Sequence, residues 1–335
     1  PNFVLPFKPW YYTSDESFFL KKVRNKIVQS YKCTSANYKV ARNCKEIIDR
    51  HNIQLIYSNS STSHIGYIVS KMYKLPHIWH IREFLGLHFN FKWSFGEYLS
   101  RKMIQTADKV ITVSQTLKDH HCRVVGDKPI QVIYDGVVSV DHFEDNAGLR
   151  ALEKRDTKYF VFAIIGSISK SKGQMQALLA LAEVKKSLLN ARLLIIGKGD
   201  RTVLEEKASE LNMTEDIEFT GHVNNVFDHY HRFDVLLVCS QREGFGMVTV
   251  EAMAGRKPVI VRDDGGPSEI VEDGKTGLKY QESYKDLAKK MIEIAKDDIN
   301  RQYMLRNAFE YSKQFSLEKF QNKVCRVLKD LNGKL

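Results

Sequence analysis

Residues 243–255 have the sequence EGFGMVTVEAMAG, and this stretch decides the fold that the chain is expected to adopt. The preceding residues 234–240, DVLLVCS, are apolar until a polar residue closes them, which is typical of a short buried strand. Residues 248–254 have the pattern of a helix, and Gly255 follows at the position of a C-cap. The stretch therefore predicts a strand, a glycine turn and a helix.

The glycine turn has the chemistry of an anion-binding site. The first amides of a helix have no acceptor within the helix, so they can bind a negatively charged group. Gly244 and Gly246 carry no Cβ atom and let a ligand approach the backbone. Glu243 lies in the turn and Glu251 lies about two helical turns further on, where the two carboxylates could bind different hydroxyls of one polar ligand. Each glutamate taken alone is equally compatible with a solvated surface position.

Two further glycine turns follow the same pattern. Residues 257–261, KPVIV, predict another strand, and residues 264–271, DGGPSEIV, predict a glycine turn that opens a helix. Residues 273–278, DGKTGL, form a third turn. Glycine turns after consecutive strands lie where open α/β sheets bind their ligands.

Taken together, residues 243–278 resemble the nucleotide-sugar site of retaining glycosyltransferases of family four, the group 1 glycosyltransferases with the GT-B fold. The resemblance extends more weakly over most of the chain. It implies an α/β protein with two Rossmann-like domains whose parallel sheets face each other across a cleft. It also implies a metal-independent transferase, with no cofactor, that moves a hexose from a UDP- or GDP-linked sugar with retention of configuration.

The same resemblance assigns roles to residues. Glu243 is expected to bind the transferred sugar and Glu251 the ribose, while Lys172 and backbone amides stabilise the diphosphate leaving group. Glu243 acts here as an orienting group, and the leaving phosphate takes the acceptor proton. The catalytic candidates are Glu243, His80 and Lys172. The other donor-binding candidates are Gly166, Ser167, Lys170, Gly173, Gly197, His222, Gly244, Phe245, Gly246 and Met247.

A lysine-bearing loop follows the first strand expected in the second half. Residues 159–165 predict a buried strand, and residues 166–173, GSISKSKG, precede a helix expected over 174–189. Basic side chains in a glycine turn suit a diphosphate. In the family an arginine stands where this chain has Ser167, so Lys170 is a candidate to compensate.

The first half alternates helix and strand, which predicts a parallel sheet with crossover helices. Strands are expected at 53–57, 76–80, 109–113 and 130–134, and helices at 43–50, 63–73, 95–105 and 115–122. His80 is expected to leave its strand at the carboxyl end and to contact the sugar or the acceptor. Arg82, Glu83 and Ser114 are the other acceptor-side candidates, although Arg82 and Glu83 can simply pair and Ser114 can simply cap a helix.

The domains are expected at 1–145 and 146–316, with a last helix at 317–335 that crosses back to the first domain. Residues 1–12 show none of the strand, glycine-rich loop and helix with which the family begins, so the first domain is expected to lack them. Residues 18–28 predict a basic amphipathic helix, which either packs on the domain or rests on anionic lipid.

Composition restricts the kinds of partner and location that the protein can have. The formal net charge is +11, and most of this excess falls in the first 150 residues. The sequence matches no nucleic-acid module, so an anionic substrate or membrane surface is the expected partner. The five cysteines are scattered without metal-ligand spacing, and no apolar run is long enough to span a membrane. A cytoplasmic enzyme, peripheral at the plasma membrane, is expected, and a homodimer is left open.

Two rival functions remain. One is an epimerase or phosphorylase on the same fold. The other is a non-catalytic subunit that retains the fold and binds a sugar nucleotide or a sister enzyme. The resemblance favours a transferase with a saccharide or lipid-linked acceptor, in the synthesis of a capsule or another bacterial cell-surface polysaccharide.

Overall fold

The computed structural model describes the backbone of residues 11–13, 19–84, 91–93, 96–125, 129–144 and 158–332, and side chains within 31–84, 98–122, 129–143 and 158–331. Most of residues 1–12 and all of residues 145–157, at the expected boundary between the domains, lie outside these ranges. The same holds for the side chains of the basic helix expected at 18–28. The proposals about these segments stay predictions.

The chain divides into two compact units. Unit 1 comprises residues 1–134 and 326–335, and unit 2 comprises residues 135–325. The two units are described separately below.

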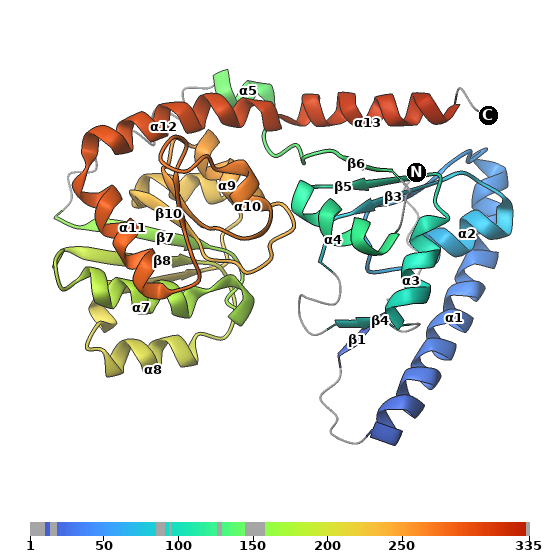
Figure 1. Ribbon diagram of the computed structural model, residues 1–335, viewed down its shortest axis with the longest axis horizontal. Coiled ribbons are helices and arrows are strands. Elements are labelled where there is room, and N and C mark those ends of the chain that lie inside the picture. The colour runs from blue at the N-terminus through green and yellow to red at the C-terminus, as the bar shows by residue number, and fades with distance from the viewer. Residues whose placement is uncertain are drawn as a thin grey trace. The chain divides into compact units, whose positions relative to one another are not determined.

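Unit 2 is built on a six-stranded parallel sheet (Figure 1). Its strand order is β12-β11-β10-β7-β8-β9, so the chain fills one half of the sheet first and then the other. This is the order of dinucleotide-binding Rossmann sheets, with the direction of winding reversed between β7 and β10. The strands are β7 (Phe160–Ile165), β8 (Ala191–Ile196), β9 (Ile217–Gly221), β10 (Val235–Val238), β11 (Val259–Arg262) and β12 (Leu278–Tyr280).

Helices cover both faces of this sheet. In Figure 1, α7 and α8 lie on one face, and α9 and α10 on the other. The core on the α7 face joins Phe162 and Leu237 of the sheet to Leu181 of α7 and Leu287 of α11. Burial on both faces explains why these strands are nearly continuous apolar runs. The helices are α7 (Gln174–Val184), α8 (Thr202–Glu210), α9 (Met247–Ala254), α10 (Gly265–Ile270), α11 (Tyr284–Lys296) and α12 (Asp298–Ser312).

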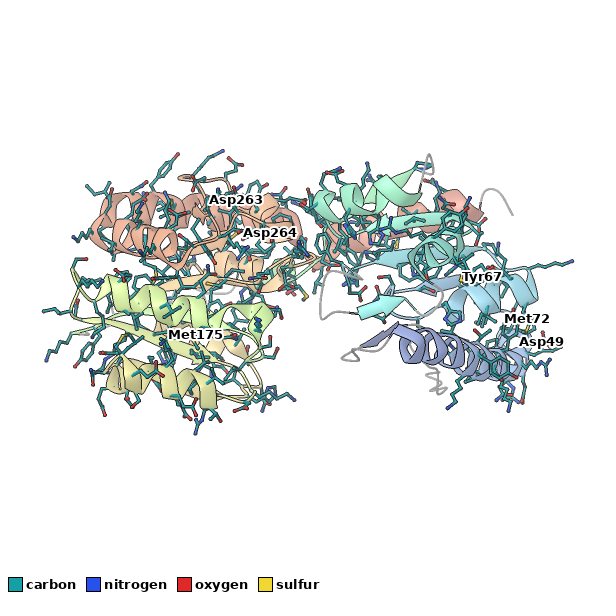
Figure 2. The ribbon with its side chains drawn as sticks, turned by 60° about the horizontal axis from the view of Figure 1, so that its bottom comes forward. Asp49, Tyr67, Met72, Met175, Asp263 and Asp264 are labelled. Carbon is teal, nitrogen blue, oxygen red and sulfur yellow. The ribbon has the colours of Figure 1, made fainter. Side chains whose placement is uncertain are left out.

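Unit 1 contains a four-stranded parallel sheet of order β2-β3-β5-β6. Ala41 of α1 forms a small core with Ile68 and Val69 of α2, and Tyr67 and Met72 pack against it (Figure 2). A separate two-stranded antiparallel pair joins β1 to β4. The elements are β1 (Tyr11–Thr13), α1 (Phe19–Arg50), β2 (Ile56–Ser58), α2 (Ile65–Tyr73), β3 (His77–Ile81), β4 (Phe91–Trp93), α3 (Gly96–Gln105), β5 (Lys109–Thr112), α4 (Gln115–Val125) and β6 (Ile130–Val132).

Two further helices among the described residues are α5 (Val140–Glu144) and α13 (Leu317–Asn332). Within the described residues, none of the helices combines the length and apolar character needed to cross a bilayer.

The structure corrects several expected elements. The helices predicted at 18–28 and 43–50 are one helix, α1, because residues 29–42 contain neither glycine nor proline to interrupt it. Helix α7 ends at Val184 rather than at 189, and its last carbonyls are bound by a tight turn in which Ser187 and Leu188 donate to Val184. Helix α8 and the short edge strand β12 were not predicted.

Candidate functional site

The candidate donor site lies at the carboxyl ends of β7 and β10, where the strand order of unit 2 reverses. At such a point the connections leave the sheet in opposite directions and open a crevice. The loop after β7 carries Lys172, and the loop after β10 carries Glu243. The sequence predicted both loops as ligand-binding turns, and the fold brings them together.

Lys172 and Glu243 form an ion pair. The Lys172 Nζ atom lies 2.5 Å from Glu243 Oε2, although 71 residues separate them in the sequence. Both side chains keep about a quarter of their surface exposed, at 27% and 24%. The sequence assigned the lysine to a diphosphate and the glutamate to a sugar, and had not predicted that they bind each other. A bound anion or hydroxyl can replace either partner at this partly exposed pair.

The glycine turns after β7 and β8 pack backbone against backbone. Gly197 has a φ of +150°, and a Cβ atom there would lie 1.9 Å from the carbonyl oxygen of Gly166. The Gly166 amide in turn donates to Ile196. Gly197 is therefore needed for this contact, which fixes the start of the lysine loop.

The lysine loop ends on the neighbouring strand. Gly173 caps α7 and lies against Cys239 at the end of β10. Ser167 is exposed, and its carbonyl accepts a bond from the Gln174 side chain. Lys170 is exposed in the same loop. These contacts hold the loop, and the ligand roles of these residues stay predictions.

Gly246 sets the direction of α9. It precedes the helix with φ +90° and ψ 56°, a left-handed conformation that glycine adopts readily. A Cβ atom there would also lie 2.6 Å from Pro267 Cγ. The side chain of Phe245 points into the core against Phe315, with ring centroids 5.8 Å apart, so only its amide can serve a ligand. Met247 begins the helix and is exposed.

The turn after β11 holds the Glu243 loop in place through hydrogen bonds, and its residues were not among the predicted site residues. The Gly266 amide donates to the Glu243 carbonyl at 2.8 Å, and Asp264 accepts from the Arg242 amide. Asp264 stands beside Asp263 at the end of β11 (Figure 2). The sequence signal was present in the second glycine turn, 264–271, which was predicted as a turn without a partner.

Glu251 lies on α9, one helical turn before its C-cap, and is half-buried. Burial raises the pKa of its carboxyl group because the charged form loses solvation. His222 follows β9 and is exposed. Neither position has been tested as a ligand contact, and both roles stay predictions.

In unit 1, His80 lies in β3, one residue before its end, and is fully buried. Its Nδ1 atom is 2.8 Å from the Tyr57 hydroxyl. Burial, with a smaller effect from the Arg82 charge, lowers the pKa of His80 to about 3, so the ring is neutral at physiological pH. The sequence placed this strand at 76–80 with His80 as its last residue, whereas β3 ends one residue later, at Ile81. Its contact with sugar or acceptor stays a prediction.

The other acceptor-side candidates bind nearby backbone and side chains. Glu83 accepts from the hydroxyls of Ser60 and Ser61, and Arg82 donates to Asn59 at 3.0 Å. Both therefore hold the turn after β2. The Ser114 hydroxyl accepts from the Leu117 amide, which is the helix-capping role that the sequence had left open.

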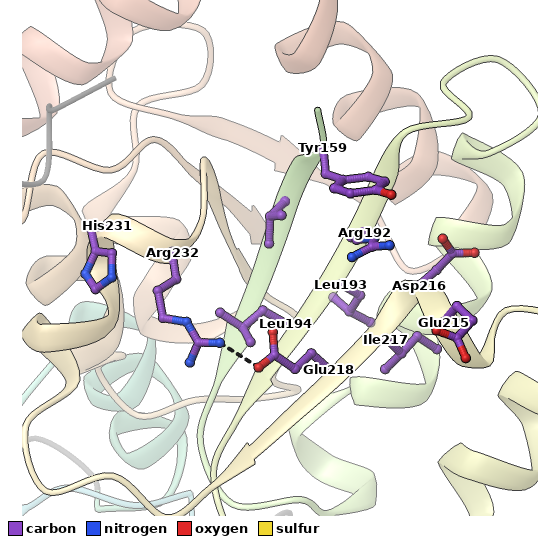
Figure 3. Close-up of a pocket in the computed structure, with 11 residues that line it drawn as sticks. Tyr159, Arg192, Leu193, Leu194, Glu215, Asp216, Ile217, Glu218, His231 and Arg232 are labelled. Atoms are coloured by element: carbon purple, nitrogen blue, oxygen red, sulfur yellow. Dashed lines mark hydrogen bonds and ion pairs between the residues drawn. The ribbon is translucent and has the colours of Figure 1, made fainter. Parts of the chain in front are cut away.

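Among the residues that the structure describes, no three His, Cys, Asp or Glu side chains gather as a metal site. A cavity of about 360 Å³ lies on the sheet of unit 2, near the opposite ends of β7 and β8 (Figure 3). Arg232 and Glu218 form an ion pair in its wall, and the Arg192 guanidinium lies 3.5 Å from the Tyr159 ring centroid. This cavity is separate from the glycine turns of the candidate donor site.

Comparison with known families gives two matches. The model described as Glycosyltransferase Family 4 matches residues 11–139, and the model described as Glycosyl transferases group 1 matches residues 147–311.

Three curated relatives cover much of the chain. It is 30% identical to the uncharacterized glycosyltransferase MJ1178 of Methanocaldococcus jannaschii, over 88% of this chain and 80% of that protein. It is 26% identical to the alpha-monoglucosyldiacylglycerol synthase of Acholeplasma laidlawii, over 82% and 73% of the two chains. It is also 26% identical to the capsular polysaccharide biosynthesis glycosyltransferase CapM of Staphylococcus aureus, over 72% and 67%.

Among solved structures, Anabaena Alr3699/HepE in complex with UDP superposes with a TM-score of 0.75. The two chains are 21% identical, and the match covers 88% of this chain and 82% of HepE. This likeness confirms the expected fold class, with two parallel-sheet domains. The two family models and the 30% identity to MJ1178 show the family, and HepE shows the fold: the chain belongs to the glycosyltransferases of the GT-B fold.

Proposed function

We propose that this glycosyltransferase moves a hexose from a UDP- or GDP-linked sugar to a saccharide or lipid-linked acceptor, with retention of configuration and without a metal ion. The observation that carries the proposal is the Lys172–Glu243 ion pair at the reversal of strand order. One cation and one carboxylate are held there at a place where such sheets bind nucleotides.

In the proposed reaction, the bond between the anomeric carbon and the donor phosphate oxygen breaks, and the acceptor oxygen bonds to the same face of the sugar. The acceptor proton passes to the leaving phosphate. Lys172 and the amides before α9 stabilise the negative charge that develops on the diphosphate. Glu243 orients the sugar hydroxyls, and Glu251 binds the ribose.

Basic groups and helix amides supply the stabilisation that a metal would give elsewhere. Ser167 stands where the family has a second cation, and the exposed Lys170 in the same loop supplies that charge. The names of the relatives CapM and alpha-monoglucosyldiacylglycerol synthase support an acceptor of the cell-surface polysaccharide or glycolipid class. Action at the cytoplasmic side of the plasma membrane, with the basic first half toward anionic lipid, fits such acceptors.

The test is thermal unfolding of the chain with UDP, GDP and their hexose conjugates, beside Glu251→Ala. A ligand at about 100 times its Kd stabilises the folded state by roughly 2.7 kcal/mol. We expect one nucleotide family to raise the midpoint, and Glu251→Ala to abolish that rise. Glu272→Ala, which removes a half-exposed carboxylate of the same unit that pairs with Lys275, should leave the rise unchanged.

Transfer is then measured with the nucleotide sugar that binds, by release of the nucleoside diphosphate. Binding without turnover, across polysaccharide and glycolipid acceptors, would favour the non-catalytic subunit. A midpoint that no nucleotide moves would contradict the donor site itself.

A further inference from the structure

Tyr230 is a buried tyrosine whose hydroxyl makes no hydrogen bond to the described residues around it. It lies in the 3₁₀ segment Val226–Arg232 and is 1% exposed. Within the described part of the chain, its hydroxyl has no hydrogen-bond partner. A buried hydroxyl usually has a partner, because leaving it unpaired destabilises the fold. The position therefore suggests a partner that appears in another state of the protein.

Neighbouring groups fix the ring in place. The rings of Phe227 and Phe233 lie 5.0 Å and 5.2 Å away between centroids. On another side the ring contacts Gly255, where a Cβ atom would come within 2.2 Å of Tyr230 Cδ2. Only a glycine at the end of α9 admits the ring this close.

Gly255 places the ring beside the helix face that carries Glu251. The two residues are four apart and share one hydrogen bond, from the Gly255 amide to the Glu251 carbonyl. Residues four apart lie on the same face of a helix. Burial, with a smaller effect from the charge of Glu251, raises the pKa of the Tyr230 phenol well above its ordinary value. The hydroxyl therefore stays protonated and remains a donor.

We infer that Tyr230 is a positioning residue for Glu251: its hydroxyl donates a hydrogen bond to the Glu251 carboxylate when a nucleotide is bound. The bond holds the carboxylate ionised and oriented so that its other lone pairs accept from the ribose hydroxyls. This inference rests on the ribose role given to Glu251 in the proposed function.

The experiment compares Tyr230→Phe with Tyr280→Phe. Tyr280 is also 1% exposed in unit 2, but its hydroxyl donates to Gln176 at 2.8 Å. Tyr230→Phe should weaken binding of UDP or GDP, whichever shifts the wild-type midpoint more, by roughly tenfold. Its own melting midpoint should be unchanged or higher, because the variant loses an unpaired hydroxyl. Tyr280→Phe should show the reverse: a lower midpoint and unchanged affinity.

A pH profile separates positioning from packing. Without the donor, Glu251 takes up a proton more readily, so binding should fail at a higher pH than in the wild type. A tenfold weaker carboxylate contact corresponds to a shift of about one pH unit in this acid limb. A change in packing alone would weaken binding equally at all pH values.

Glu251→Ala keeps the two hypotheses apart. If it loses binding while Tyr230→Phe binds as the wild type, the positioning role is wrong and the proposed function stands. If Glu251→Ala binds as the wild type, or no nucleotide binds the wild type, the ribose role and the inference both fail.

Discussion

The two units place their polar candidate residues in different environments. In unit 2, Lys172 and Glu243 lie on loops at a reversal of strand order, and about a quarter of each side chain is exposed. In unit 1, whose four-stranded sheet has its strands in chain order, His80 and Ser114 are fully buried, whereas Arg82 and Glu83 are half-buried. The comparison teaches that a polar residue near a strand end becomes available to a ligand where connections diverge. Elsewhere the neighbouring turn can cover it.

The largest expected difference between the units is in how much stability each loses at acidic pH. His64, His80 and His121 all lie in unit 1, and burial lowers their pKa values to about 4, 3 and 3 from 6.5. The unfolded chain therefore binds protons that the folded unit does not, and stability falls as pH drops below 6.5 toward these values. Between pH 7 and pH 5 each histidine should remove roughly 2 kcal/mol from the free energy of unfolding.

Tryptophan fluorescence measures this in unit 1 alone, because the three tryptophans (10, 79 and 93) all belong to it. In urea at pH 5, the fluorescence transition should precede the loss of circular dichroism, whereas the two should lie closer together at pH 7. A fluorescence midpoint that does not move with pH would contradict the assignment of buried, neutral histidines.

The second prediction concerns the exposed pair of unit 2. Lys172→Met should lower the transfer rate about 10²–10³-fold, because it removes a charge that stabilises the leaving group. Lys170→Met, from the same loop, should lower it far less. Equal losses in the two variants would mean that the loop acts only through its general charge. Glu243→Gln combined with Lys172→Met should cost less than the product of the single losses, since the two residues act together.

The third prediction concerns the turn that positions α9. Gly246→Ala should destabilise unit 2 by about 3 kcal/mol, because the substitution adds backbone strain and a contact with Pro267. Gly274→Ala is the matched control, since Gly274 also has a positive φ, +72°, but has open space around its Cβ position. Urea unfolding followed by circular dichroism should show a loss of only about 1 kcal/mol there. Similar losses would indicate that strain alone, and not the close approach, requires glycine.

The smallest expected effect is in unit 1. Tyr57→Phe removes the hydroxyl that pairs with His80 Nδ1 and should cost about 1 kcal/mol, measured by tryptophan fluorescence in urea. Transfer activity should fall only modestly if this bond merely supports the strand. A loss as large as that of Lys172→Met would indicate that the orientation of His80 matters for the reaction.

Most strands were predictable because a buried parallel strand is a short apolar run with no alternation. The run at 159–165 became β7 within one residue, and the run at 234–240 contains β10, which ends two residues earlier, at Val238. The positions of the glycine turns in unit 2 were equally clear, since few other residues tolerate their backbone angles. Helix ends and edge elements were harder, as α7, α8 and β12 show, because tertiary contacts set them.

The individual residues of the candidate site could be predicted from the sequence, but their contacts with one another could not. The sequence indicated Lys172 and Glu243 separately, but 71 residues separate them and only the strand order brings them together. The hydrogen bond from Gly266 to Glu243 could not be predicted either, because it also depends on the order of the strands in the sheet. Nothing in the sequence indicated a functional role for Tyr230, since a tyrosine before an apolar run is an ordinary core residue.

If Lys172 and Glu243 hold the donor as proposed, their ion pair makes donor binding an exchange rather than an addition. The incoming diphosphate and sugar take over charges that already satisfy one another, so the measured affinity is the difference between two sets of contacts. Salt screens the pair in the free protein as well as the diphosphate in the complex. Donor affinity should therefore depend less on ionic strength than it would with an unpaired lysine. Donor binding should then change little when the salt concentration around the protein changes.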